Sequence, residues 1–188
     1  LFFNHAHAAD VTGGDVLVDA GHPAPTPIAA GNAHDIPGAT DNRNVVGNKL
    51  TLDGVAPYQS YGGYTAGTGN ATNNTIIYKN FVPLNGYGYA GYSEGGNATN
   101  NIAILTNSPA TTSLYLYGGA SGNGGADVRT GNELRATTKN NNVARIYNFE
   151  KLHFDLDSSI NSGDYLLYVR DNTGQSYDWS NITVNGAT

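Results

Sequence analysis

The chain has 188 residues, of which 39% are hydrophobic and 13% charged, and its formal net charge at pH 7 is −6. Low charge combined with 13 tyrosines excludes a disordered chain, and the lack of any cluster of Lys and Arg argues against a nucleic acid partner. The absence of cysteine excludes a disulfide framework and a thiolate metal site. No apolar run approaches the roughly 20 residues of a membrane helix, so no membrane insertion is expected.

Residues 1–44 are predicted to form an N-terminal arm. The small-x-small pattern of Ala6-His7-Ala8 after an apolar start is similar to the end of a secretory signal, and a flexible leader is the alternative. Four prolines between residues 21 and 44 indicate an extended linker, because proline is excluded from central strands. The apolar residues of this arm, which we expect to mediate assembly, are Leu1, Phe2, Phe3, Val16, Leu17 and Val18.

Residues 45–142 carry an internal repeat. A motif of tyrosine and glycine begins at Tyr61 and recurs at Tyr89 and Tyr117, at a spacing of 28 positions each time. Self-similarity of this kind predicts one supersecondary unit stacked on copies of itself. Each Gly-Asn or Asn-Asn corner is followed by a short alternating strand, which favours a parallel β-helix. The alternative, an antiparallel sandwich, does not require sequence identity between its repeats.

The alternating strands predict which side chains enter the core. Every second residue after a corner should point inward, and four of these residues are predicted to share one interior column: Leu50, Leu52, Ile76 and Leu134. In the intervening repeat, counting from the tyrosines selects Ile104, and counting from Asn101 selects Ala103. We favour Ile104, because an alanine would leave a hole in the core.

Residues 143–188 depart from the repeat and contain denser strands, at 146–156, 165–169 and 182–184. A solenoid needs atypical terminal units to close its core and its sheet edges. The predicted fold is therefore all-β: a parallel β-helix with coils of about 28 residues and a strand-rich C-terminal cap.

The tyrosines near the glycine corners are the candidate binding residues: Tyr61, Tyr64, Tyr89 and Tyr92. If they stack in register, they form an aromatic ladder. Exposed rings would offer a platform for a glycan or a partner protein, whereas buried rings would only support stacking between coils. We favour buried or half-buried rings.

No catalytic residues and no complete metal site are predicted. Glycoside cleavage needs paired carboxylates, but the acids of the repeats fall in different coils: Asp53, Glu94, Asp127 and Glu133. His5 and His7 share a strand face without any carboxylate beside them. A second group of acids lacks the glycine and the last acid of a calcium loop: Asp155, Asp157 and Asp164, with Asn161. We expect no enzyme and no cofactor, although His5 and His7 could bind a divalent metal and the turn acids could bind calcium.

The repeat motifs between Tyr61 and Asn101 resemble repeats of autotransporter-type surface proteins of Gram-negative bacteria. The segments 148–156 and 161–164 resemble the module that often closes such repeats, and the resemblance covers about residues 45–185. It implies a right-handed β-helical passenger that is exported through the outer membrane. The C-terminal barrel strands of that family are not present in this sequence, so we expect a fragment or a free secreted relative.

These patterns together predict a non-enzymatic, extracellular protein of the bacterial cell surface that acts as adhesin or structural scaffold. Its expected partners are a host or bacterial surface glycan, a protein, or further copies of itself. The first alternative is a pilus-like fibre subunit that polymerises by strand addition of its N-terminal arm. A polysaccharide-active enzyme is the less favoured alternative.

Overall fold

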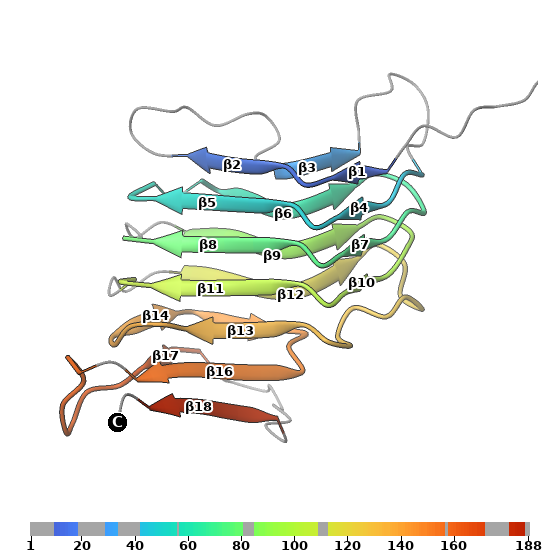
Figure 1. Cartoon of the computed structure of the whole chain (residues 1–188). Helices are drawn as coiled ribbons and strands as arrows, with labels where there is room; N and C mark the ends of the chain where they lie inside the picture. Colours follow the sequence, from blue (N-terminus) through green and yellow to red (C-terminus); the bar gives the residue numbers. More distant parts are fainter. Residues whose placement is uncertain are drawn as a thin grey trace, which may run out of the picture.

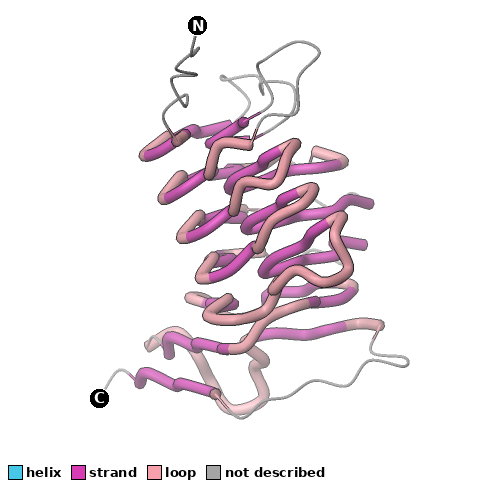
Figure 2. Tube along the Cα trace, turned by 90° about the vertical axis from the view of Figure 1, so that its right-hand side faces the viewer, coloured by secondary structure: helices cyan, strands magenta, loops and turns pink. Residues whose placement is uncertain are grey.

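The computed structural model of the chain describes residues 10–18, 29–33, 42–55, 57–80, 85–108, 113–156, 158–171 and 181–186. Every regular element within these residues is a β-strand (Figure 2), so this part of the chain has no helix that could cross a membrane. Strands of successive coils pair in parallel and stack into a β-solenoid (Figure 1). The predicted all-β parallel β-helix with coils of about 28 residues is confirmed.

The strands belong to four parallel sheets. The short sheet contains β1 (Val11–Thr12), β4 (Val45–Val46), β7 (Ala71–Thr72) and β10 (Ala98–Thr99). The seven-strand sheet contains β2 (Asp15–Val18), β5 (Lys49–Asp53), β8 (Thr75–Lys79), β11 (Ile102–Thr106), β13 (Glu133–Ala136), β16 (Lys151–Leu156) and β18 (Ile182–Gly186). The five-strand sheet contains β3 (Ala29–Ala33), β6 (Gln59–Thr65), β9 (Asn85–Ser93), β12 (Ser113–Ser121) and β15 (Arg145–Tyr147). The two-strand sheet pairs β14 (Asn141–Val143) with β17 (Leu167–Val169).

The corner between the short sheet and the seven-strand sheet explains the Gly-Asn and Asn-Asn pairs of the sequence. The first residue of each pair has a positive φ, with 57° at both Asn73 and Asn100 and 69° at Gly47. Glycine adopts this left-handed backbone conformation readily, and asparagine adopts it at a lower energetic cost than most other residues do. The predicted corners are therefore present, and each one sends the chain into a strand of the seven-strand sheet.

Two inward columns of the seven-strand sheet form one wall of the core. The first contains Leu50, Ile76, Ala103, Leu134 and Leu152, and the second contains Leu52, Tyr78, Leu105 and Ala136. All of these side chains are buried. The prediction that Leu50, Ile76 and Leu134 share one column is confirmed, whereas Leu52 belongs to the second column.

The choice of Ile104 over Ala103 as the inward residue is wrong. Ala103 is fully buried and pairs with Ile76, whereas Ile104 lies on the outer face of the sheet. The tyrosines and the asparagines of the two repeats differ in spacing by one residue. This difference lies in the corner before the strand, because residues 66–70 join β6 to β7 and only 94–97 join β9 to β10. Asn101 therefore keeps its place beside Asn74, and the strand that follows keeps the phase of the asparagines.

A buried row of asparagines holds the coils together at this corner. We call it the asparagine ladder, and it contains Asn48, Asn74, Asn101 and Asn132, each at most 1% exposed. Asn101 Oδ1 accepts hydrogen bonds from the backbone N–H of Asn74 at 3.0 Å and from its Nδ2 at 3.2 Å. The same two bonds recur at the neighbouring steps. Every rung is thus paired inside the protein, as buried polar groups require.

Glycines in the five-strand sheet make room for the asparagine ladder. A Cβ atom built on Gly63 would lie 2.5 Å from Cγ of Asn74, and one on Gly91 would lie 2.5 Å from Nδ2 of Asn101. No side chain larger than hydrogen fits at these positions. The glycines of the repeated tyrosine motif therefore serve the close approach of two walls of the coil.

The N-terminal arm predicted for residues 1–44 needs correction, because part of it is the first coil. Val16 pairs with Leu50 and Val18 with Leu52, and β3 pairs with β6. Val16 and Val18 therefore lie on the same face of the sheet as the inward residues of β5, and Leu17 lies on the outer face. Strand β2 thus extends the seven-strand sheet by one strand. The other predicted assembly residues lie outside the described part of the chain: Leu1, Phe2 and Phe3.

The region predicted as a cap, residues 143–188, continues two of the sheets. The seven-strand sheet runs on through β16 to β18, and the five-strand sheet ends with β15. The departure from the repeat is the pairing of β14 with β17. Ile182 and Val184 of β18 are 50% and 55% exposed, although they follow the inward columns of the sheet.

Candidate functional site

The outer face of the five-strand sheet carries a continuous stack of tyrosine rings. We call it the tyrosine stack, and it contains Tyr61, Tyr89, Tyr117 and Tyr147. Successive ring centroids are 5.1, 4.9 and 4.5 Å apart, with interplanar angles of 10°, 22° and 12°. Parallel strands in register produce this arrangement, because they place identical residues directly above one another.

A second row beside the stack brings the four predicted binding residues together. Tyr64 stacks on Tyr92 at 5.5 Å, and Tyr61 stacks on Tyr89. The two rows meet edge to face, at 5.1 Å between Tyr61 and Tyr64 and at 5.4 Å between Tyr89 and Tyr92. These residues therefore form one four-tyrosine cluster. Tyr61 is 8% exposed and the other three are half-buried, so the predicted burial is confirmed.

The four-tyrosine cluster has one carboxylate at its edge. The hydroxyl of Tyr92 donates a hydrogen bond to Oε1 of Glu94 at 3.2 Å. Burial, followed by the charge of Glu94, raises the pKa of Tyr92 to about 12. Burial also raises the pKa of Tyr61, Tyr64 and Tyr89. All four phenols are therefore neutral hydrogen-bond donors at physiological pH.

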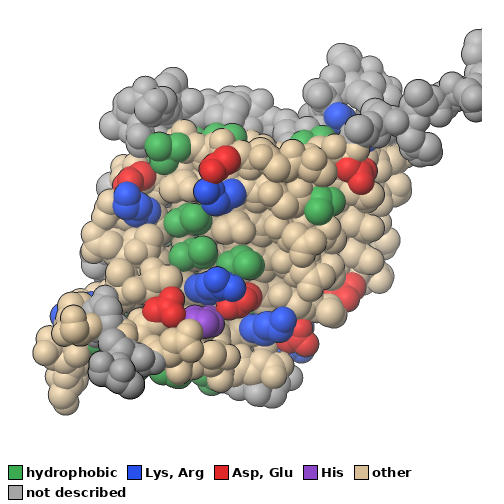
Figure 3. All heavy atoms as spheres, viewed as in Figure 1, with side chains coloured by type: hydrophobic (Ala, Val, Ile, Leu, Met, Phe, Trp, Pro, Cys, Tyr) green, Lys and Arg blue, Asp and Glu red, His purple; other side chains and the backbone are tan. Residues whose placement is uncertain are grey.

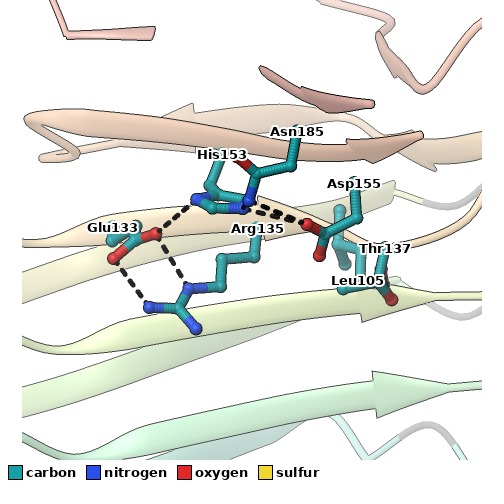
Figure 4. Close-up of polar contacts among 7 residues, drawn as sticks. All are labelled: Leu105, Glu133, Arg135, Thr137, His153, Asp155 and Asn185. Carbon is teal, nitrogen blue, oxygen red and sulfur yellow. Dashed lines mark hydrogen bonds and ion pairs between the residues drawn. The ribbon is translucent and has the colours of Figure 1, made fainter. Parts of the chain in front are cut away.

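A cluster of polar side chains lies on the outer face of the seven-strand sheet, on the strands nearest the C-terminus. Figure 3 shows charged side chains gathered on this part of the face, beside hydrophobic ones. The residues in contact, which we call the His153 cluster, are Glu133, Arg135, His153, Asp155 and Asn185 (Figure 4). They come from β13, β16 and β18, which are adjacent strands of the sheet.

His153 lies between two carboxylates in this cluster. Its Nδ1 is 3.5 Å from Oε1 of Glu133, and its Nε2 is 3.0 Å from Oδ1 of Asp155. Nδ2 of Asn185 also lies 2.9 Å from Nε2, so this nitrogen can accept from the amide or donate to Asp155 in any one state. Arg135 binds both oxygens of Glu133, at 2.8 and 3.1 Å. The carboxylates of Glu133 and Asp155 are both paired with side chains of the protein. These polar contacts link adjacent strands of the sheet.

The other acids considered from the sequence are dispersed over the solenoid. Asp53 pairs with Lys79 at 2.8 Å, and Asp164 pairs with Lys139 at 2.9 Å. Asp127 accepts hydrogen bonds from the backbone N–H groups of Thr130 and Arg129 at the corner after β12, and these bonds, that from Thr130 above all, lower its pKa. No group of three or more His, Asp and Glu side chains in the described residues is placed to hold a metal ion. His5, His7 and Asp157 lie outside that part of the chain.

Two features of the structure were not anticipated from the sequence. The His153 cluster depends on which outward residues of β13, β16 and β18 align, and Arg135 pairs with His153 across the first two of these strands. The signal for it was the alternation of polar residues within each strand. The buried role of the asparagine ladder was also missed, although its corners were recognised.

Comparison of the chain with protein-family models, with curated proteins and with solved structures finds no match. The functional argument therefore starts from the four-tyrosine cluster and from the side-chain ladders that run along the solenoid.

Proposed function

We propose that the chain is an exported, non-enzymatic solenoid of the bacterial cell surface that acts as a rigid scaffold and adhesin. The observation that carries this proposal is the four-tyrosine cluster, which presents aromatic rings on the five-strand sheet of a solenoid whose successive coils the asparagine ladder joins. Tyrosine offers a large contact area at low entropic cost, which suits recognition of a glycan or a protein. The resemblance of the repeats to autotransporter-type passengers supports an extracellular location.

The scaffold part of the proposal rests on the direction of the side-chain ladders. The tyrosine stack and the asparagine ladder both run along the solenoid axis, so each coil contributes contacts to the next one. Proteins of this kind gain stability from interfaces between neighbouring repeats. A rod of this type can hold a binding surface at a fixed distance from the cell.

Surface display tests the adhesive role. The chain is fused to an outer-membrane translocator on a non-adherent bacterium, and attachment of the cells to glycan-coated and protein-coated surfaces is counted. We expect adhesion that is lost in the variant with both Tyr64→Ser and Tyr92→Ser. The matched control is Leu17→Ser, which changes a 47% exposed side chain on another sheet. If the chain is displayed and folded but the cells do not adhere, only the scaffold role remains. Glycan turnover by the purified chain would contradict the non-enzymatic part of the proposal.

A second candidate function is self-assembly into a fibre, and one observation favours it. Ile182 and Val184 of β18 are exposed, and no strand within the described residues pairs with the outer edge of β18. Exposed edge strands with apolar side chains pair readily with other chains. Val16–Val18 already pair with β5, so β18 replaces them as the expected assembly strand. Polymers in sedimentation experiments that disappear in Val184→Lys, but persist in Thr183→Lys, would support this function.

A further inference from the structure

The second row of tyrosines stops two coils before the tyrosine stack does. Backbone pairing continues the stack from Tyr89 to Tyr117, but it places Ala120 directly after Tyr92. Tyr64 covers the opposite face of the Tyr92 ring, at an interplanar angle of 12°. The face of Tyr92 toward the next coil therefore meets an alanine where a further ring would complete the row.

The contacts of Tyr92 confirm that this face carries no ring. Its edge contacts are with Tyr61 at 5.7 Å and with Tyr89 at 5.4 Å. Both partners lie in the same coil as Tyr92 or in the preceding one, and within the described residues no ring contact joins Tyr92 to Tyr117. Within the described residues, the known ring contacts of Tyr92 therefore leave its face toward Ala120 without an aromatic partner.

A hydrogen-bond acceptor lies beside this free face. Glu94 is exposed, and its Oε1 accepts a hydrogen bond from the hydroxyl of Tyr92 at 3.2 Å. It makes no ion pair among the described residues, so its carboxylate keeps acceptor capacity for hydroxyl donors. The negative charge of Glu94, together with the net charge of −6, disfavours an anionic ligand.

We propose that the gap formed by Tyr92, Ala120 and Glu94 binds one sugar ring of a neutral, β-linked glycan of gluco configuration. Such a pyranose carries its hydroxyls around the edge and exposes apolar C–H groups on its two faces. One face can cover the Tyr92 ring and remove apolar surface from water, while edge hydroxyls donate to Glu94. This inference rests on the proposed adhesive function and names the ligand class of its site.

The purified chain titrated with cellohexaose provides the test, followed by saturation-transfer NMR on the sugar and by chemical shifts of the tyrosine rings. We expect weak binding, with a Kd on the order of 1 mM or somewhat tighter. Ala120→Tyr completes the row, so it should raise the melting temperature and weaken binding at least tenfold. Ala120→Ser keeps the gap and is the matched control, with binding within about twofold. Glu94→Gln should weaken binding less than Ala120→Tyr does.

The outcomes separate this inference from the proposed function. Equal binding by the parent chain and Ala120→Tyr, or no binding of cellohexaose by a folded parent chain, overturns the assignment of the gap. Preference for a sialylated oligosaccharide over cellohexaose also overturns it, because the ligand would then be anionic. If displayed cells still adhere in those cases, the adhesive function stands and its ligand is of another class. Circular dichroism of each variant shows whether a loss of binding reflects unfolding.

Discussion

Asn74 Oδ1 accepts two hydrogen bonds from Asn48, one from its backbone N–H at 3.1 Å and one from its Nδ2 at 3.0 Å. Nδ2 of Asn74 donates in turn to the carbonyl oxygen of Val45 at 2.9 Å and to Asn101 Oδ1 at 3.2 Å. One side chain thus satisfies buried groups of the preceding coil and is itself satisfied by the following one. The corner is therefore a chain of obligate polar contacts.

Replacement of Asn74 by Ala should destabilise the solenoid by about 2–4 kcal/mol, because it leaves buried donors and an acceptor without partners. The measurement is urea denaturation followed by circular dichroism. The neighbouring residue supplies the control: Asn73 is exposed with a φ of 57°, and Asn73→Gly should change stability by less than about 0.5 kcal/mol. Equal effects of the two changes would contradict the role of the ladder.

Consecutive residues of β8 should respond in opposite ways to a charge. Ile76→Asp places an unpaired carboxylate in the core and should cost several kcal/mol, whereas Ile77→Asp stays on the outer face and should be tolerated. The same contrast is expected for Ala103→Asp and Ile104→Asp in β11. Melting temperatures of the four variants test the register, and a severe effect of Ile104→Asp with a mild one of Ala103→Asp would reverse it.

Removal of one ring from the tyrosine stack should weaken it on both sides. Tyr89 stacks on Tyr61 and on Tyr117, so Tyr89→Ala should cost about 1–3 kcal/mol beyond its loss of buried area. Tyr58 is 66% exposed, and its one ring contact within the described residues is an edge contact with Tyr87, so Tyr58→Ala should have a much smaller effect. Denaturant midpoints of both variants, measured side by side, provide the comparison.

Alkaline pH should unfold the chain through its tyrosines. Burial raises the pKa of Tyr92 in the folded state from 10.0 to about 12, so the folded state favours the neutral phenol. The resulting stability is fully present below pH 10 and is lost as the pH rises toward 12. We expect the free energy of unfolding to fall in this window, and less steeply in Tyr92→Phe, which has no phenol to ionise. An unchanged slope in that variant would assign the loss to other groups.

Chelation of divalent ions should leave stability almost unchanged. The carboxylate of Asp164 already binds Lys139 and the backbone N–H of Asn161, and the hydrogen bond from Asn161 is the main cause of its lowered pKa. The measurement is the melting temperature with and without EDTA. A drop of more than about ten degrees would show that turn residues bind calcium.

The sequence was sufficient to predict the coils, because their signals are local and repeated. Gly47, Asn73 and Asn100 mark corners through a backbone conformation that few residues adopt. Ala103 was misassigned because alanine was judged too small for the core, whereas its register depends on Asn101 and on the length of the preceding corner. The lengths of two such corners can be compared only when the strands before and after each corner are known.

The site could be predicted in part. Tyr61, Tyr64, Tyr89 and Tyr92 were recognised from their spacing, and parallel stacking does bring them together. Their edge-to-face packing and the gap beside Tyr92 depend on ring orientation, which the spacing does not define. The first coil was missed because four prolines lie between residues 21 and 44, and this composition was interpreted as a linker.

The register between Ala71 and Ala98 also makes the molecule adjustable in length. These residues are direct neighbours in adjacent coils, so residues 71–97 form one complete circuit of the chain. Their removal would join Asn70 to Ala98 and restore the same Asn-Ala-Thr-Asn-Asn run across the junction. Genes for such a protein can therefore gain or lose whole circuits by recombination, and the distance that it spans can change without the evolution of a new core.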